Sequence, residues 1–194
     1  MAHPHVAVAQ PSQWVSRFAS LVPKGEVLDL ACGSGRHAKL LAALGHPVLA
    51  VDRDAEALAV AAGPGIQPLR IDLEQDGMRP ASWPLVPGRF AGVVVTNYLH
   101  RPLIEDIMAS LMPGGVLIYE TFAEGNQRFG KPSNPNFLLR QGELLCAAQN
   151  ARPYPLRVVA FEDGYVSRPA PAMVQRICAI MAPGDQQPDG LALN

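Results

Sequence analysis

The run Val27-Leu28-Asp29-Leu30-Ala31-Cys32-Gly33-Ser34-Gly35 decides the fold of this chain. Its first five residues are a short, mainly apolar segment, which predicts a buried parallel strand that ends at the glycine-rich turn. Apolar residues then continue at helical spacing over residues 36–44, and Gly45 predicts the end of that helix. We therefore expect this stretch to be the first strand–turn–helix unit of an α/β domain.

The alternation of short strands and helices continues to residue 121. Asp54 is the expected N-cap of an alanine-rich helix through Ala62, and Pro102 is expected in the first turn of a helix through Leu111. This alternation predicts a parallel sheet with helices on both faces. The further strands of this part are predicted at residues 48–51, 67–71, 93–96 and 116–121.

The last third of the chain follows a different pattern. A polar loop over residues 122–137 precedes a predicted helix at 139–148, and strands are predicted at 156–161 and 173–181. No helix separates these last two strands, so they are expected to pair antiparallel at the edge of the sheet. The predicted fold is a doubly wound, Rossmann-like sheet of seven mostly parallel strands with an antiparallel C-terminal pair.

Composition limits the other possibilities. The 194 residues, 48% of them hydrophobic, suit one domain over 1–194, with a helical segment at 1–24 and a loose tail at 183–194. A net charge of −1 gives no reason to expect nucleic acid as a partner. The three scattered cysteines favour a reducing cytoplasm over disulfides or a metal site, and no apolar run is long enough for a membrane span.

The glycine loop predicts a ligand site, because it joins a buried strand to the N-terminus of a helix. With Ala38 it also fits the dinucleotide fingerprint G-x-G-x-x-A, so an NAD-dependent oxidoreductase is an alternative. Asp29 disfavours that alternative, because a carboxylate near a pyrophosphate costs on the order of 1 to 4 kcal/mol. The same carboxylate would attract an ammonium group. Two more carboxylates are expected at the same edge, at the ends of the next two strands: Asp52, which suits ribose hydroxyls, and Asp72, which suits an adenine amino group.

These residues resemble the first motif of the class I S-adenosylmethionine-dependent methyltransferases. The continuation through Arg36 and His37 to Val51-Asp52 is similar to the small bacterial tellurite-resistance-type methyltransferases, and Pro113-Gly114-Gly115 is typical of the wider class. The resemblance implies S-adenosylmethionine as cofactor and S-adenosylhomocysteine as product. It implies that four segments contact the cofactor. The methionine and ribose parts would be surrounded by Asp29, Ala31, Gly33 and Gly35, and the ribose would also be held by Asp52 and Arg53. The adenine would be held by Asp72 and Leu73, and Asn97 would lie beside the sulfonium.

The acceptor side is expected just after the fourth strand. Tyr98 could line the methyl pocket or pack in the core, and His100 could act as a general base or be a loop residue that caps the next helix. In the loop at 122–137, Arg128 and Lys131 could bind an anionic acceptor or simply be solvated. A small-molecule or ionic acceptor is predicted, and a binding module without catalysis is the remaining alternative.

Overall fold

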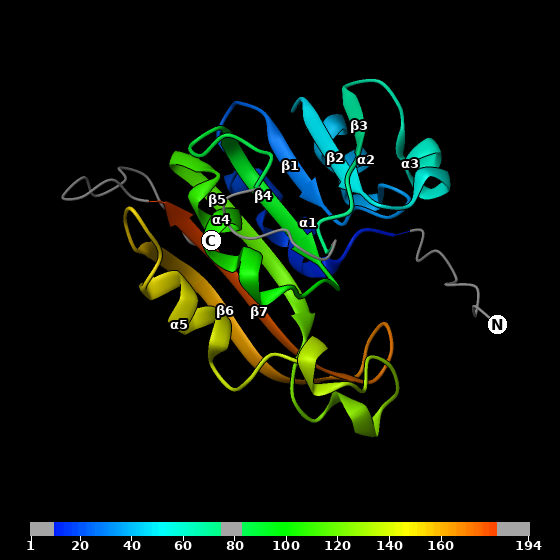
Figure 1. The fold of residues 1–194 in the computed structure, drawn as a ribbon, viewed down its shortest axis with the longest axis vertical. Coiled ribbons are helices and arrows are strands. Elements are labelled where there is room, and N and C mark those ends of the chain that lie inside the picture. Colours follow the sequence, from blue (N-terminus) through cyan, green and yellow to red (C-terminus); the bar gives the residue numbers. More distant parts are fainter. Residues whose placement is uncertain (1–9, 75–82, 182–194) are drawn as a thin grey trace.

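The computed structural model describes residues 10–74 and 83–181, and its centre is a seven-stranded sheet with the order β3-β2-β1-β4-β5-β7-β6 (Figure 1). Strands β1 to β5 are parallel, and β7 pairs antiparallel with both β5 and β6. The predicted fold is therefore confirmed. The strands are β1 (Val27–Leu30), β2 (Val48–Asp52), β3 (Ile66–Arg70), β4 (Phe90–Thr96), β5 (Leu111–Phe122), β6 (Leu156–Val166) and β7 (Ala172–Met181).

Helices cover both faces of the sheet. On one face lie α1 (Gln13–Phe18), α2 (Arg36–Ala43) and α3 (Ala55–Ala61), which pack on alternate residues of the central strands. On the other face lie α4 (Ile104–Ala109) and α5 (Glu143–Gln149). The alternation of β1 places Leu28 and Leu30 against α4 and α5 and directs Asp29 toward α2. Within the described residues, no helix is long and apolar enough to cross a membrane.

The helix boundaries follow local chemistry. Asp54 is the N-cap of α3, as predicted, because its carboxylate accepts hydrogen bonds from the Glu56 and Ala57 amides. The predicted helix at 139–148 instead begins at Glu143, because Leu139 pairs with Ala123 in an isolated bridge. A 3-10 turn over 101–103 precedes α4, so this helix is shorter than predicted.

Strand β5 begins earlier than predicted. Phe90 pairs with Leu111 and Gly92 pairs with Val116, so residues 112–115 form an irregularity between two paired positions. This segment holds Pro113-Gly114-Gly115, which lies between the predicted helix through Leu111 and the predicted strand at 116–121. The N-terminal segment 1–24 lies partly outside the described residues, and the predicted tail at 183–194 lies wholly outside them.

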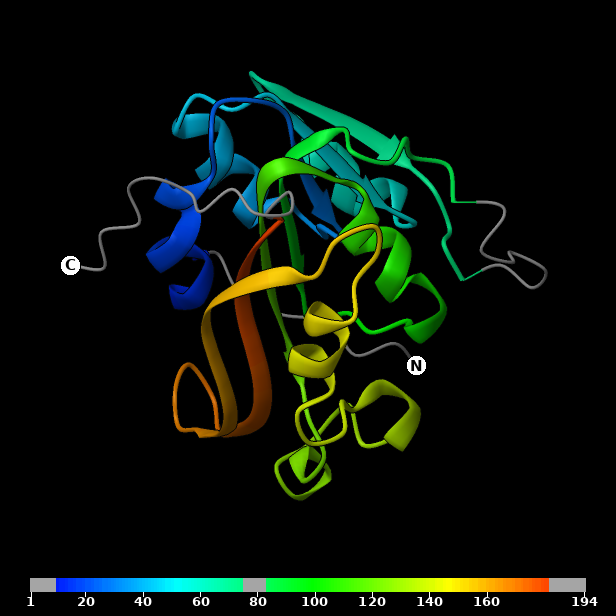
Figure 2. The same ribbon diagram turned by 90° about the vertical axis from the view of Figure 1, so that its left-hand side faces the viewer.

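The segment of residues 123–142, called the lid below, leaves the end of β5 and projects beyond the sheet next to the β6–β7 hairpin (Figure 2). Two short 3-10 turns interrupt it, at Asn126–Arg128 and Pro135–Phe137. Asn126 is buried and fastens the lid, because its side-chain amide donates to the Pro132 carbonyl and its oxygen accepts from the Met173 amide. The polar loop predicted at 122–137 is thus an ordered structure.

Candidate cofactor and acceptor site

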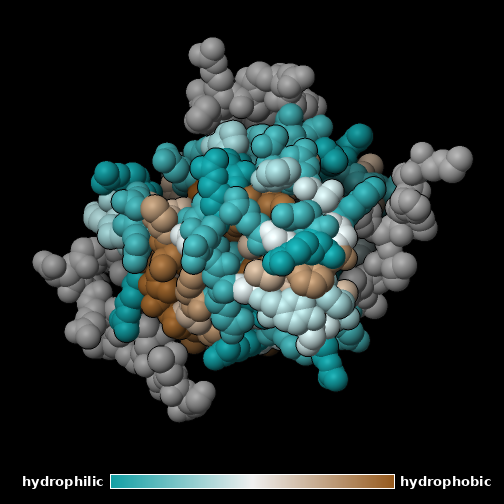
Figure 3. Space-filling model, turned by 90° about the horizontal axis from the view of Figure 1, so that it is seen from below, coloured by the Kyte–Doolittle hydropathy of each residue, from teal (hydrophilic) through white to brown (hydrophobic). Residues whose placement is uncertain are grey.

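The carboxyl ends of the parallel strands gather the predicted site residues at one edge of the sheet. Because β1 lies between β2 and β4, the segments that follow these three strands are neighbours. Figure 3 views the molecule from the side toward which the parallel strands run, and this surface is largely hydrophilic with an apolar area on one side. Open α/β sheets bind ligands at this edge, at the point where the strand order reverses.

Two residues at this edge have left-handed backbone conformations that cost energy. Ala31, which follows β1, has φ 53°, and Asn97, which follows β4, has φ 55°. Within the described residues, no other non-glycine residue has a positive φ. A non-glycine residue in this region costs on the order of 1 to 2 kcal/mol, and such strain clusters at ligand sites. Both residues were predicted to contact the cofactor, and they follow adjacent strands.

Asp29 is a buried carboxylate beneath the glycine loop. It is 1% exposed, and its Oδ2 accepts a hydrogen bond of 2.8 Å from the Ala38 amide in the first turn of α2. Its Oδ1 is buried and accepts no hydrogen bond from the described residues. Burial raises the pKa of Asp29 to about 7. A buried carboxylate oxygen that lacks a donor is costly alone, and a nearby cation would stabilise its charge. The site therefore fits an ammonium-bearing ligand.

The two glycines of the loop have different roles. Gly35 has φ 75°, and a Cβ there would lie 2.6 Å from the Cβ of Ala61 in α3. Gly33 has φ 52°, but a Cβ there would meet no atom within 4 Å. Gly35 thus serves the packing of α2 on α3, whereas Gly33 borders open space. Only Gly33 matches the expected role of letting a ligand approach the backbone closely.

Asp52 stabilises the glycine loop and also lies at the carboxyl edge of the sheet. Its Oδ2 accepts from the Gly33 amide at 2.8 Å, and its Oδ1 accepts from the Asp54 amide at 3.0 Å. Each carboxylate oxygen can accept more than one hydrogen bond, so both remain available to a ribose hydroxyl. The sequence indicated the ribose role but not the bond to Gly33.

The end of β3 contributes a smaller cluster. Asp72 accepts a hydrogen bond from the Glu74 amide at 3.0 Å, and Glu74 forms an ion pair with Arg53 at 3.6 Å. Leu73 is 6% exposed and packs in the apolar core. Of the two residues predicted for the adenine, Asp72 keeps its carboxylate at the edge of the sheet, whereas Leu73 belongs to the core cluster.

Tyr98 lies close to these strand-end charges. Its backbone carbonyl accepts a hydrogen bond of 2.9 Å from the Tyr119 hydroxyl, while its own hydroxyl is buried and makes no hydrogen bond with the described residues. Burial raises the pKa of Tyr98, and the charges that act on the phenol belong to Glu74, Arg53, Asp72 and Asp52. These groups follow β2 and β3, on the side expected to hold the nucleoside.

His100 follows in the same segment and makes no side-chain hydrogen bond within the described residues. Its side chain is partly exposed, at the position that precedes the 3-10 turn over 101–103. It does not cap that turn, so the capping role considered for it is wrong. The general-base role stays a prediction.

A polar network at the ends of β4 and β5 was not predicted. The imidazole of His37 accepts from the Ser12 amide at 3.0 Å and lies 3.4 Å from the Thr96 hydroxyl. Ser12 donates to Glu120 at 2.8 Å, and Glu120 forms a mostly buried ion pair with Arg176 at 2.9 Å. Burial lowers the pKa of His37 to about 3, so this histidine is neutral. The network ties α1 to the carboxyl edge. The strand-end rule that found Asp52 would also have found Glu120, which lies near the end of β5.

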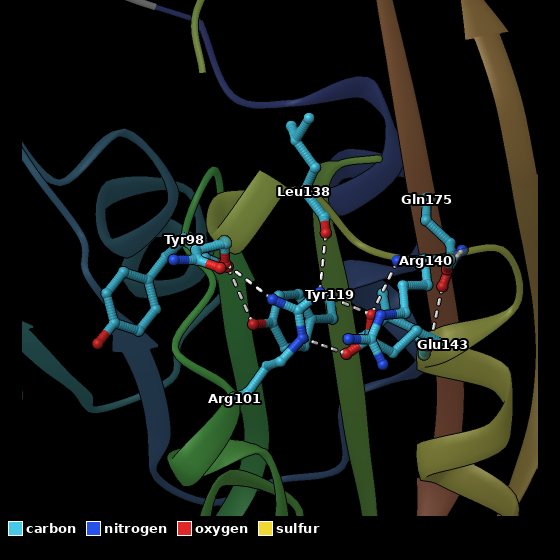
Figure 4. A network of polar contacts seen from close by, with 9 residues as sticks. Tyr98, Arg101, Tyr119, Leu138, Arg140, Glu143 and Gln175 are labelled. Carbon is cyan, nitrogen blue, oxygen red and sulfur yellow. Dashed lines mark hydrogen bonds and ion pairs between the residues drawn. The ribbon is translucent and has the colours of Figure 1, made fainter. Parts of the chain in front are cut away.

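Arg101 joins the site to the lid (Figure 4). Its guanidinium binds both carboxylate oxygens of Glu143, at 2.7 and 2.9 Å, and donates to the carbonyls of Asn136 and Leu138, each at 2.8 Å. Burial alone would raise the pKa of Glu143, but the hydrogen bonds from Arg101 and from the Arg140 amide outweigh it and lower the pKa. The sequence predicted site residues in this segment, Tyr98 and His100, but it did not predict a role for Arg101.

The predicted lid cations lie on the surface. Arg128 and Lys131 are exposed, and Arg128 makes one long hydrogen bond of 3.5 Å to the Gly125 carbonyl. No salt bridge to either side chain is present within the described residues. Their role toward an anionic acceptor stays a prediction.

The comparisons with known proteins agree with this geometry. Residues 27–115 match the model of a family described as a methyltransferase domain. The chain is 32% identical to a protein-L-isoaspartate O-methyltransferase of Chlorobaculum tepidum over 62% of its own length and 57% of the relative's. It is 34% identical to the putative methyltransferase YqeM of Bacillus subtilis over 60% of its own length and 49% of the relative's. The chain thus spans about half the length of the curated relatives it matches.

Solved structures show the same fold. The crystal structure of TehB from Haemophilus influenzae has a TM-score of 0.69 and 16% identity, with 88% of this chain and 62% of that chain covered. At this identity the likeness concerns the fold alone. The family match covers the glycine loop, Asp29 and Asp52. Residues 27–115 of this chain are therefore similar to a methyltransferase domain, and the similarity includes the glycine loop.

Proposed function

We propose that the protein transfers a methyl group from S-adenosylmethionine to a small-molecule or ionic acceptor. The observation that carries the proposal is the buried carboxylate of Asp29 beneath the glycine loop, with one oxygen left without a donor. A buried negative charge attracts a cation strongly because the local dielectric is low. It would repel a pyrophosphate for the same reason, which is why the dinucleotide alternative is disfavoured.

When bound, S-adenosylmethionine supplies a methyl group that is activated by the positive sulfonium. The protein then has to hold an acceptor in line with this methyl group, at about 3 to 3.5 Å. Asn97, at the end of β4, is the residue we assign to the sulfonium side. His100 is the proposed base for an acceptor that arrives protonated, and Arg128 and Lys131 are the proposed contacts for an anionic one.

The experiment compares ligands and two matched variants by calorimetry. Wild type should bind S-adenosylhomocysteine and not NAD. Asp29→Asn keeps an oxygen that can accept from the Ala38 amide but removes the charge, so we expect at least about a tenfold loss of affinity, equivalent to 1.4 kcal/mol. Asp54→Asn is the control, because asparagine caps a helix as well as aspartate does and should leave binding unchanged.

Binding of NAD alone would sink the proposal, and equal affinity of Asp29→Asn and wild type would remove its physical basis. A screen with cofactor labelled on the methyl group tests the transfer itself. If the protein binds S-adenosylhomocysteine but labels no member of a broad panel of oxyanions, thiols, amines and carboxylic acids, a binding module without catalysis is the better description.

A further inference from the structure

Tyr98 carries a polar group that the fold does not use. Its hydroxyl is buried and unpaired within the described residues, although its ring packs against the apolar core. The Tyr119 hydroxyl holds the Tyr98 carbonyl at 2.9 Å, and the preceding residue, Asn97, is locked by its own amide, which donates to the Glu120 carbonyl. A buried hydroxyl without a partner costs about 1 to 3 kcal/mol. The structure around Tyr98 therefore stabilises its position but not its hydroxyl.

The direction of the side chain separates Tyr98 from the lid. In Figure 4 the Tyr98 ring points away from Arg101, Glu143 and the carbonyl of Leu138. The charged groups that influence its phenol follow β2 and β3 instead, and include Asp52 and Asp72. Tyr98 thus extends from the end of β4 toward the part of the edge where a nucleoside would lie.

We propose that Tyr98 is a cofactor-positioning residue, whose hydroxyl hydrogen-bonds the nucleoside half of S-adenosylmethionine rather than acting on the methyl acceptor. This inference rests on the proposed function. The charges that act on the phenol include the ion pair of Arg53 and Glu74, which is long at 3.6 Å and formed by a 66% exposed arginine side chain. An exposed pair of this kind contributes little, so these side chains can turn aside when a nucleoside enters.

The test uses Tyr98→Phe with two ligands, S-adenosylhomocysteine and 5′-methylthioadenosine, which has the nucleoside but no amino-acid part. Loss of one net hydrogen bond should weaken both ligands by the same factor, about 3- to 10-fold. The thermal midpoint of the ligand-free variant should equal or exceed that of wild type, because the change removes an unpaired buried hydroxyl. Tyr165→Phe, at an exposed tyrosine of β6, is the matched control and should change neither quantity.

The outcomes separate the possible roles. Weaker S-adenosylhomocysteine with unchanged 5′-methylthioadenosine would assign Tyr98 to the amino-acid end and overturn the inference. Unchanged affinity for both ligands, or a lowered midpoint without a loss of affinity, would make Tyr98 a structural residue. If wild type binds neither ligand, the proposed function fails and this inference falls with it, whatever the variant does.

Discussion

Over β1 and β2, carboxylates bind backbone amides, whereas over β4, β5 and β7 charged side chains bind one another. Asp29 and Asp52 hold the amides of Ala38 and Gly33, which shapes the cofactor loop. On the other half, ion pairs dominate: Arg101 with Glu143, and Glu120 with Arg176. The difference indicates that the half with the glycine loop is built by hydrogen bonds to nearby backbone amides, and that the half with the lid depends on pairings between distant residues.

The largest effect is expected from the half with the glycine loop, at Gly35. Alanine there would have a positive φ and a Cβ only 2.6 Å from Ala61, so we expect Gly35→Ala to lower the free energy of unfolding by about 3 kcal/mol. In a chain of this size that corresponds to a drop of roughly 10 °C in the thermal midpoint. Gly33→Ala is the matched control, because only its positive φ is costly, at about 1 kcal/mol. Equal midpoints for the two variants would contradict the division of roles between these glycines.

A second prediction concerns how the free energy of unfolding depends on pH. Two buried titratable groups are involved: Asp29, which binds the first turn of α2, and His37, which lies in that helix. The folded-state pKa of Asp29 is raised from 3.8 to about 7, so its contribution to stability is present below pH 4 and is lost as pH rises through 7. The folded-state pKa of His37 is lowered from 6.5 to about 3, so its contribution is present above pH 6.5 and is lost as pH falls toward 3. Between about pH 4 and 6.5 the two effects oppose each other.

Single variants should therefore reveal slopes of opposite sign. In Asp29→Asn only the His37 titration remains, so the stability of this variant should rise with pH between about pH 4 and 6.5. In His37→Gln only the Asp29 titration remains, so the stability of that variant should fall over the same range. One proton sets an upper limit of about 1.4 kcal/mol per pH unit for either slope. Urea unfolding at several pH values measures both. Slopes of the same sign in the two variants would show that one of these assignments is wrong.

The smallest effect is expected from the half with the lid, at Arg101. Arg101→Met removes the hydrogen bonds to Glu143 and to the carbonyls of Asn136 and Leu138 but keeps an apolar side chain of similar length. This pair is partly exposed, so we expect a global loss of only about 1 kcal/mol. Hydrogen exchange should speed up in the lid, residues 123–142, and stay unchanged in 27–52. A uniform increase across both segments would mean that Arg101 supports the whole fold and not the lid.

Most of the fold could be predicted because its signals are local. Apolar runs, glycines and prolines set the strands, and Asp54 follows a capping rule that needs only neighbouring residues. The start of α5 could not be predicted in this way, because Leu139 lies outside the helix in a bridge to Ala123, sixteen residues earlier in the chain. The start of β5 was missed because pairing with Phe90 extends the strand across a proline and two glycines.

The sequence by itself determined the glycine loop and the carboxylates near the carboxyl ends of β1, β2 and β3, because a strand, a turn and a helix N-terminus are coded within a few residues of one another. Only the tertiary structure decided how these groups are used. It paired the Asp52 carboxylate with the Gly33 amide, made His37 neutral by burial, buried the Tyr98 hydroxyl without a partner, and joined Arg101 to Glu143. These pairings depend on burial and on the distance between side chains from separate elements, and neither quantity is set by local sequence.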